Sequence, residues 1–194
     1  MRYLFFDTET TGTPKDYKAH ASNTDNWPRI VQLAWLLQED NGDILSQGNM
    51  IIKPEGFEIP EDAAKVHGIT TEIALEKGIP LKDVMRHFFT ALQMANVVVG
   101  HNINFDAHVV DSEFYRIHGK CYVEHMKQLD TMIPSTNFCK IPKAKGYGYK
   151  WPKLQELHMK LFECEFDDAH DAFADITATS RCFWELVKRG IIIE

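Results

Sequence analysis

The sequence predicts an α/β fold in which a mixed β-sheet is flanked by helices and residues 1–194 form a single domain. Three strand-like runs come first, at residues 3–8, 30–38 and 49–53, and residues 44–47 could begin the third. The turn signal Asp40-Asn41-Gly42-Asp43 between the second and third runs predicts an antiparallel meander. Helical patterns then alternate with short apolar runs, which indicates parallel strands added to the meander and helices packed on the sheet.

The helical patterns follow in order along the rest of the chain. Pro60 opens the first, at residues 60–66, from the first helical position. Residues 80–94 carry apolar side chains at helical spacing, and residues 105–118, 151–162 and 171–189 are also predicted to be helical, with Gly190 ending the last helix. The apolar run 97–100 predicts a central strand buried on both faces, and residues 128–131 predict another short strand. Residues 137–151 are predicted to form a Lys- and Gly-rich loop.

Composition sets the broad class of the protein. A hydrophobic content of 44% and a charged content of 25% are ordinary for a soluble globular protein. The net charge of −7 argues against a nucleic-acid binder, unless a bound cation cancels part of it locally. No signal peptide or apolar run of transmembrane length is found, so no membrane partner is expected. The four widely spaced cysteines predict reduced thiols in a cytoplasmic protein: Cys121, Cys139, Cys164 and Cys182.

Two carboxylates end the first strand-like run, where Asp7 and Glu9 precede a Thr-Thr-Gly turn. Side chains alternate along a strand, so both carboxylates point to the same face. A rise of about 3.3 Å per residue puts them about 6.6 Å apart along the strand. Their repulsion and lost hydration predict a cation between them. On this motif alone, a charged strand end exposed to solvent is the better interpretation.

Two more segments place acidic residues at the ends of predicted elements. The strand at 97–100 leads through Asn102 to Asp106, and ligands of α/β sheets gather at such strand ends. The helix dipole alone could also favour Asp106 in a first turn. Near the last helix, His170 and Asp175 lie five positions apart, or about 140° around a helix, so they converge only if His170 precedes the helix. Asp171 is then the expected helix cap.

These residues form a set that suits metal chemistry: Asp7, Glu9, Asp106, Asp175 and His170. Oxygen-rich sites select hard cations such as Mg²⁺ or Mn²⁺. Two such ions about 3.5–4 Å apart can activate a water and stabilise the leaving oxygen of a phosphodiester. A histidine with a pKa of about 6.5 can accept the water's proton near neutral pH.

Three segments, FDTETTG, GHNINFD and HDAFAD, resemble in this order the exonuclease motifs of the DnaQ-like family, in the form with a histidine in the third motif. The family includes the proofreading epsilon subunit of bacterial DNA polymerase III and related free-standing 3′–5′ exonucleases. The resemblance extends from residue 3 to about residue 187 and implies a ribonuclease-H-like fold.

The resemblance implies a role for each matching residue. Asp7, Glu9 and Asp175 would hold the metal ion that binds the nucleophilic water. Asp7 would also bridge to a second ion, which Asp106 reaches directly or through water, and His170 would be the general base. The residues implied to meet the 3′-terminal nucleotide are Thr10, Thr11, Asn102 and His67, although turn, cap and local hydrogen-bond roles are the alternatives.

A basic segment, residues 140–153, holds five lysines, three aromatic residues and no acid. Lysines can neutralise phosphates and aromatic rings can stack on unpaired bases, and a mobile solvated loop is the equal alternative. Asp130 is the strongest competing carboxylate and is expected to be structural. His101 and three other histidines are expected to be ordinary packing or surface residues: His108, His118 and His125.

The sequence therefore predicts a metal-dependent 3′–5′ exonuclease that releases nucleoside 5′-monophosphates from single-stranded or frayed DNA. Two divalent ions, Mg²⁺ or Mn²⁺, are its expected cofactors, and nucleic-acid 3′ ends are its expected partners. An RNA-directed exonuclease of the same family and a non-catalytic, polymerase-associated binding module are the alternatives. No sequence feature decides between DNA and RNA, or between a free-standing enzyme and a partner of a DNA polymerase.

Overall fold

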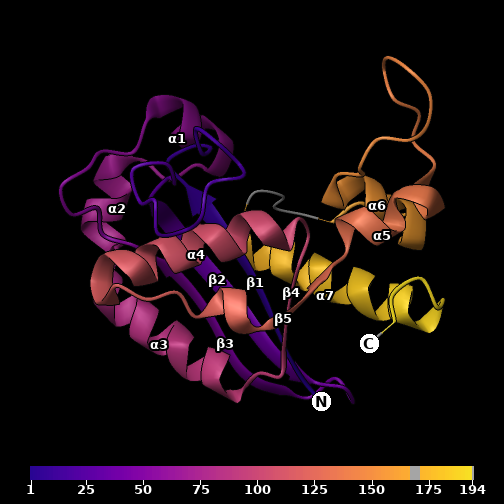
Figure 1. Ribbon diagram of the computed structural model, residues 1–194, viewed down its shortest axis with the longest axis horizontal. Helices are drawn as coiled ribbons and strands as arrows, with labels where there is room; N and C mark the ends of the chain where they lie inside the picture. Colours follow the sequence, from indigo (N-terminus) through magenta and orange to yellow (C-terminus); the bar gives the residue numbers. More distant parts are fainter. Residues whose placement is uncertain (167–170, 194) are drawn as a thin grey trace.

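The computed structural model describes residues 1–166 and 171–193, and in this part of the chain a five-stranded mixed sheet is flanked by helices (Figure 1). The strand order is β3-β2-β1-β4-β5, with antiparallel pairing of β1, β2 and β3 and parallel pairing of β1, β4 and β5. The predicted mixed sheet is thus confirmed. The elements in chain order are β1 (Arg2–Thr10), β2 (Ile30–Glu39), β3 (Ile44–Ile51), α1 (Glu61–His67), α2 (Thr71–Lys77), α3 (Leu81–Met94), β4 (Val97–Gly100), α4 (Ile103–His118), the 3-10 helix η1 (Val123–His125), β5 (Lys127–Asp130), α5 (Met132–Cys139), α6 (Leu154–Phe162) and α7 (Ala172–Lys188). No helix among them is long and apolar enough to span a bilayer.

Several predicted boundaries are wrong for local reasons. Pro60 is the N-cap of α1 in an extended conformation, not its first helical residue. Helix α6 begins at Leu154 rather than at residue 151, because the Glu156 carboxylate accepts from the Lys153 backbone N–H at 2.7 Å and satisfies this donor at the helix N-terminus. Strand β3 runs without a break from residue 44 to 51, so residues 52–53 lie outside it.

Helices α2, η1 and α5 were not predicted. Helix α5 occupies residues 132–139 and so takes residues 137–139 from the predicted loop. Its proline, Pro134, sits in the first turn, where the backbone N–H has no helical partner to lose. A proline inside a short segment is usually taken as a helix breaker, so this helix was not predicted from the sequence pattern.

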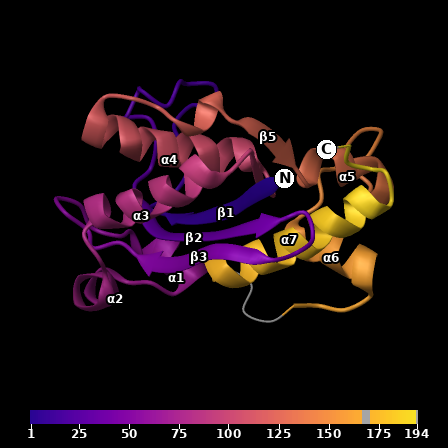
Figure 2. The same cartoon turned by 90° about the horizontal axis from the view of Figure 1, so that it is seen from below.

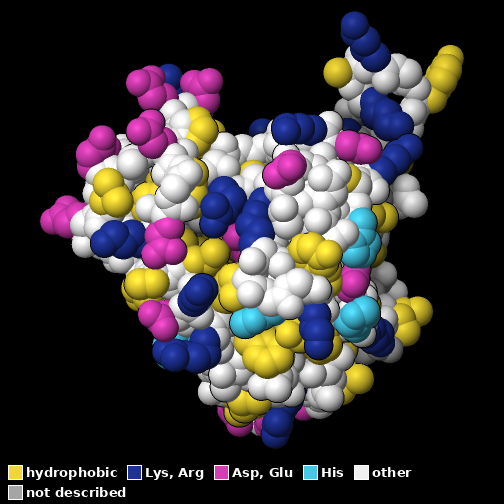
Figure 3. Space-filling model, turned by 60° about the vertical axis from the view of Figure 1, so that its left-hand side comes forward, with side chains coloured by type: hydrophobic (Ala, Val, Ile, Leu, Met, Phe, Trp, Pro, Cys, Tyr) yellow, Lys and Arg dark blue, Asp and Glu magenta, His cyan; other side chains and the backbone are white. Residues whose placement is uncertain are grey.

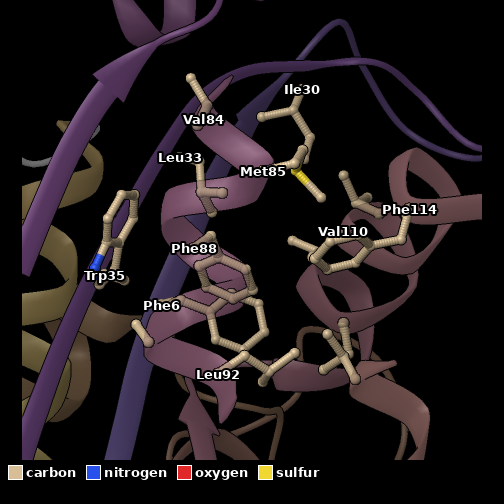
Figure 4. Packing of buried hydrophobic residues seen from close by; sticks show 14 of the residues in the cluster. Phe6, Ile30, Leu33, Trp35, Val84, Met85, Phe88, Leu92, Val110 and Phe114 are labelled. Carbon is tan, nitrogen blue, oxygen red and sulfur yellow. The ribbon is translucent and has the colours of Figure 1, made fainter. Parts of the chain in front are cut away.

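The two faces of the sheet bury two different cores. Leu4 and Phe6 of β1 face α3 and α4, whereas Tyr3 and Phe5 face α6 and α7. Figure 2 shows the sheet between α3 and α4 on one side and α7 on the other. On the α3–α4 side, Phe88 packs its ring edge-on against Phe6 at a centroid distance of 5.2 Å (Figure 4). Helices thus cover both faces of the strand that ends in Asp7 and Glu9.

The alternation along β1 continues past its apolar part. Thr8 lies on the α4 side and contacts Asp106 of that helix. Asp7 and Glu9 lie on the other side, where Asp175 of α7 approaches them. The prediction that Asp7 and Glu9 share a face is therefore confirmed.

Candidate active site

Three carboxylates converge where β1 ends against the first turn of α7. One carboxylate oxygen each from Asp7, Glu9 and Asp175 lies within 4.8 Å of the others, and we call these residues the three-carboxylate group. Ala172 and Ile176 are buried in the core on this face, so the start of α7 is packed against the sheet. Oxygen donors of this kind suit a hard divalent cation. The residues present therefore fit the metal that the sequence predicts.

The electrostatics of the three-carboxylate group favour a bound cation. Burial, and then the charges of Asp106, Asp175 and Glu9, raise the pKa of Asp7 well above its ordinary value. Burial and the charges of Asp175 and Asp106 raise the pKa of Glu9 to about 8. Asp7 and Glu9 are thus harder to ionise, first because they are buried and then because other carboxylates are close. A positive ion between them would reverse this effect.

Asp106 lies close by but outside the three-carboxylate group. It projects from the first turn of α4, as predicted, and is only 4% exposed. Its Oδ1 accepts hydrogen bonds from the backbone N–H of Thr8 at 3.0 Å and from the Thr8 hydroxyl at 2.7 Å. Burial raises the pKa of Asp106 to about 7, although the Thr8 hydrogen bonds lower it. Asp106 thus joins the site from the opposite face of β1.

The N-terminus of α7 is fixed by Asp171, which confirms the predicted cap. Its Oδ1 accepts from the backbone N–H groups of Phe173 and Ala174 at 3.0 and 3.1 Å. Gln32 of β2 donates to its Oδ2 at 3.4 Å. These contacts hold the turn from which Asp175 projects. His170 lies outside the described residues, so its role as general base stays a prediction.

The Thr-Thr-Gly turn next to the carboxylates is held by internal hydrogen bonds. The Thr10 hydroxyl donates to the Gly12 carbonyl at 2.7 Å, and the Thr11 hydroxyl accepts from the Arg29 N–H at 3.0 Å. The Thr10 hydroxyl is therefore engaged within the turn, and the Thr11 hydroxyl is engaged by the segment that leads into β2. His67 lies beside the same turn. Burial lowers the pKa of His67, and a hydrogen bond with the Thr10 backbone partly opposes that shift.

Asn102 and Asp130 join the ends of β4 and β5. Asn102 has a φ of 72°, in the left-handed region that asparagine tolerates better than most residues. Its N–H donates to Asp130 Oδ1 at 3.2 Å, and the same oxygen accepts from the Met132 N–H at 2.6 Å. The prediction that Asp130 is structural is confirmed. Asn102 therefore has a backbone role in the turn before α4.

The sequence predicts that His101 is an ordinary packing or surface residue, but the structure places it in the wall of the carboxylate cavity. It lines a cavity of about 510 Å³ together with Asp7, Asp175 and Lys153. Its Nε2 donates to the Pro152 carbonyl at 2.9 Å, and its Nδ1 lies 2.9 Å from the Thr131 hydroxyl. The signal that could have identified it is its place directly after a parallel strand.

Comparison with known proteins gives the family. Residues 4–183 match the RNase T family model, which is described as "Exonuclease". The PolC-type DNA polymerase III of Pediococcus pentosaceus is 27% identical over 189 residues, covering 96% of this chain and 11% of the relative. The DNA polymerase III subunit epsilon of Buchnera aphidicola from Acyrthosiphon pisum is 30% identical over 112 residues, covering 58% of this chain and 44% of the relative. The chain thus spans less than half the length of these relatives.

Solved structures show the same fold. Escherichia coli exonuclease I, crystallised with a dT13 oligonucleotide, superposes with a TM-score of 0.75 at 22% identity, covering 97% of this chain and 41% of that one. The ribonuclease-H-like architecture predicted from the sequence is confirmed. The matched family model spans most of the chain and shows that the chain belongs to the exonuclease family, in agreement with the DnaQ-like resemblance of its motifs.

Proposed function

We propose that this chain acts as one exonuclease domain that removes nucleotides from the 3′ end of single-stranded or frayed DNA and releases nucleoside 5′-monophosphates. The observation that carries the proposal is the three-carboxylate group, whose oxygens lie within 4.8 Å of one another in a chain of the exonuclease family. The polymerase III relatives and the DNA-bound exonuclease I structure support DNA as the substrate.

Asp7, Glu9 and Asp175 would hold a divalent ion, and Asp106 would contribute to a second one beside Asp7. Mg²⁺ or Mn²⁺ suits this all-oxygen donor set. Such ions, when bound, lower the pKa of water and stabilise negative charge on phosphodiester oxygens. The raised pKa values of Asp7 and Glu9 support the assignment, because closely spaced buried carboxylates ionise readily only beside a cation.

Other residues would handle the proton and the substrate. His170, five residues before Asp175, would accept the proton of the attacking water. The turn at Thr10 and Thr11, which hydrogen bonds to Gly12 and Arg29 hold in place, would receive the terminal nucleotide, partly through its backbone groups. His67 beside Thr10 and Asn102 after β4 would complete this pocket.

The test is digestion of a 5′-labelled single-stranded 20-mer with Mg²⁺, with Mn²⁺ or with EDTA. We expect a ladder that shortens from the 3′ end only when metal is present, with nucleoside 5′-monophosphates as the product. The variants D7A, D175N and H170A should nearly abolish the reaction while keeping wild-type circular dichroism. D62N, at an Asp side chain that is 99% exposed, is the matched control and should digest normally.

Two results would overturn the proposal. Wild-type turnover by D175N would contradict the assignment of Asp175 as a metal ligand. Shortening from the 5′ end, or cleavage of a circular single strand, would remove the 3′–5′ exonuclease assignment. Digesting a matched RNA 20-mer in parallel decides the sugar preference, because a family member directed at RNA would degrade it faster than DNA.

The relatives support a further part of the proposal, a polymerase partner for which this domain proofreads. Faster removal of a mismatched than of a matched primer end would support it.

The four free cysteines, three of them buried, support a reducing compartment such as the cytoplasm.

A further inference from the structure

Residues 140–153, which we call the Lys-aromatic arm, form a hairpin that projects beyond α5 and α6 (Figure 1). Pro142 and Tyr149 form an antiparallel bridge, and the Lys150 N–H donates to the Ile141 carbonyl at 2.9 Å. Gly146 and Gly148, with φ values of 83° and 91°, make the turn. The arm therefore has a defined shape.

Most side chains of the arm face solvent, and those at its tip, residues 142–149, are all exposed. Tyr147 is fully exposed and Trp151 is 63% exposed, which is unusual for large aromatic residues. Among the described residues, no acidic group pairs with Lys143 or Lys145. Figure 3 shows Lys or Arg and hydrophobic side chains gathered on this projection, at the upper right. The arm thus presents free positive charge beside exposed rings.

The base of the arm is fixed, in contrast to its tip. Lys150 pairs with both oxygens of Glu156 at 2.6 and 2.7 Å. The Pro152 carbonyl accepts from His101, which directly follows β4. These contacts tie the arm to α6 and to the end of the central strand. They also mean that Lys150 serves the structure, while Lys143 and Lys145 are free for a ligand.

Two hollows follow one another along this segment. The cavity of about 510 Å³ that holds Asp7 and Asp175 is also lined by Lys153, at the base of the arm. A second hollow, of about 370 Å³, is lined by Lys143, Tyr149, Lys150 and Trp151. The segment 150–153 contributes to both, with Lys153 lining the first and Lys150 and Trp151 lining the second. A chain leaving the carboxylates past Lys153 would reach the aromatic side chains next.

We propose that the Lys-aromatic arm binds the single strand upstream of the nucleotide being removed. Tyr149 and Trp151 stack on unpaired bases, with Tyr147 further out, and Lys143 and Lys145 neutralise phosphates. The proposal rests on the proposed exonuclease function and adds a second contact region to it. Because the protein has a net charge of −7 and as a whole repels a polyanion, a local cluster of lysines is needed to attract the DNA strand.

The experiment compares substrates with and without an upstream strand. The p-nitrophenyl ester of thymidine 5′-monophosphate has no upstream nucleotide, whereas a DNA ladder of 2, 4, 8 and 20 nucleotides adds them stepwise. In the wild type, kcat/KM should rise with length. The variants K143Q/K145Q and Y147A/W151A should lose about tenfold on the 20-mer and keep the wild-type rate on the ester, because each lost stacking or phosphate contact weakens only upstream binding.

Salt dependence separates charge from stacking. For single strands each phosphate contact adds about 0.7 to the slope of log affinity against log salt, so K143Q/K145Q should reduce the slope by about 1.4. Y147A/W151A should leave the slope unchanged. K77Q/K120Q, which removes two exposed lysines from α2 and from the segment after α4, is the matched control and should behave as wild type.

Some outcomes would overturn the arm proposal. Unchanged length dependence and salt slope in both arm variants would show that the arm does not meet the substrate. An equal loss on the ester would show that the substitutions disturb the carboxylate site instead. If the wild type hydrolyses neither substrate, the exonuclease proposal fails, and fluorescence anisotropy of a labelled 20-mer still tests the arm by comparing the arm variants with K77Q/K120Q.

Discussion

The backbone N–H and the hydroxyl of Thr8 both donate to Oδ1 of Asp106, at 3.0 and 2.7 Å. One carboxylate oxygen is thus tied to β1 from the α4 side, while Asp7 and Glu9 leave the same strand toward α7. Four acidic side chains therefore meet at the end of one strand from both faces of the sheet. Burial raises the pKa of Asp106, and the Thr8 hydrogen bonds partly oppose that rise.

T8V should raise the pKa of Asp106 above its value of about 7, because the lost hydroxyl stabilises the ionised carboxylate. The acidic limb of the activity–pH profile should shift to higher pH. Loss of a hydrogen bond to a buried charge should also reduce the free energy of unfolding by about 1–3 kcal/mol. T90V, on the exposed surface of α3, should change stability by less than about 0.5 kcal/mol. An unshifted profile in T8V would contradict this reasoning.

The stability of the metal-free protein should report the repulsion around Glu9. Its pKa of about 8 in the folded state lies above the ordinary value of 4.5. Between these values the unfolded chain releases the proton and the folded chain keeps it, so the Glu9 contribution to stability falls as pH rises from about 4.5 to 8. In EDTA, E9Q should therefore unfold at a higher temperature than the wild type at pH 8, and the difference should shrink toward pH 5.

Added Mn²⁺ should reverse this order. A bound cation stabilises the wild-type carboxylate set more than the E9Q set, and a ligand that binds the folded state alone raises the unfolding temperature. E9Q should gain less from Mn²⁺ than the wild type, as measured by calorimetry. E76Q, at an exposed glutamate of α2, provides the baseline. If E9Q and the wild type follow the same curve in EDTA, the three carboxylates do not repel one another as argued.

The local part of this site could be predicted from the sequence. Alternation along a strand placed Asp7 and Glu9 on one face, and capping preference placed Asp171 at the start of α7. Both rules need only neighbouring residues and fixed backbone periods. The meander was also predictable, because the turn at residues 40–43 joins strands that are adjacent in sequence.

The remaining features depend on contacts between distant segments. Asp106 reaches Thr8 across 98 positions of sequence, and His101 meets Pro152 across 51. No local period encodes such pairs, because they arise only when α4 and the Lys-aromatic arm pack beside the sheet. The role of Thr11 is similar: its hydroxyl is engaged by Arg29, 18 positions away, a contact that the turn motif does not reveal.

Arg29, whose backbone contacts Thr11, is held in place through its side chain by an ion pair with the buried Glu113. Glu113 of α4 is fully buried and accepts from Arg29 Nε at 2.7 Å, and its Oε1 lies 3.2 Å from Arg116 Nη1. E113A should cost about 3–5 kcal/mol of unfolding free energy, because it leaves two guanidinium groups without their partner. E185A, which breaks a surface pair with Arg189, should cost at most about 1 kcal/mol. Equal losses in urea denaturation would contradict the importance of burial.

The cap at Asp171 should link the stability of α7 to metal binding. D171A removes the acceptor for the N–H groups of Phe173 and Ala174, so it should cost about 1 kcal/mol and fray the turn that holds Asp175. D171N keeps an acceptor oxygen and should retain most of the stability. Mn²⁺ affinity, measured by titration calorimetry, should therefore fall in D171A more than in D171N. Equal losses of affinity would mean that the charge of Asp171 affects the metal more than its hydrogen bonds do, because both substitutions remove the charge and only D171A removes the cap. A larger loss in D171N than in D171A would contradict the role of the cap.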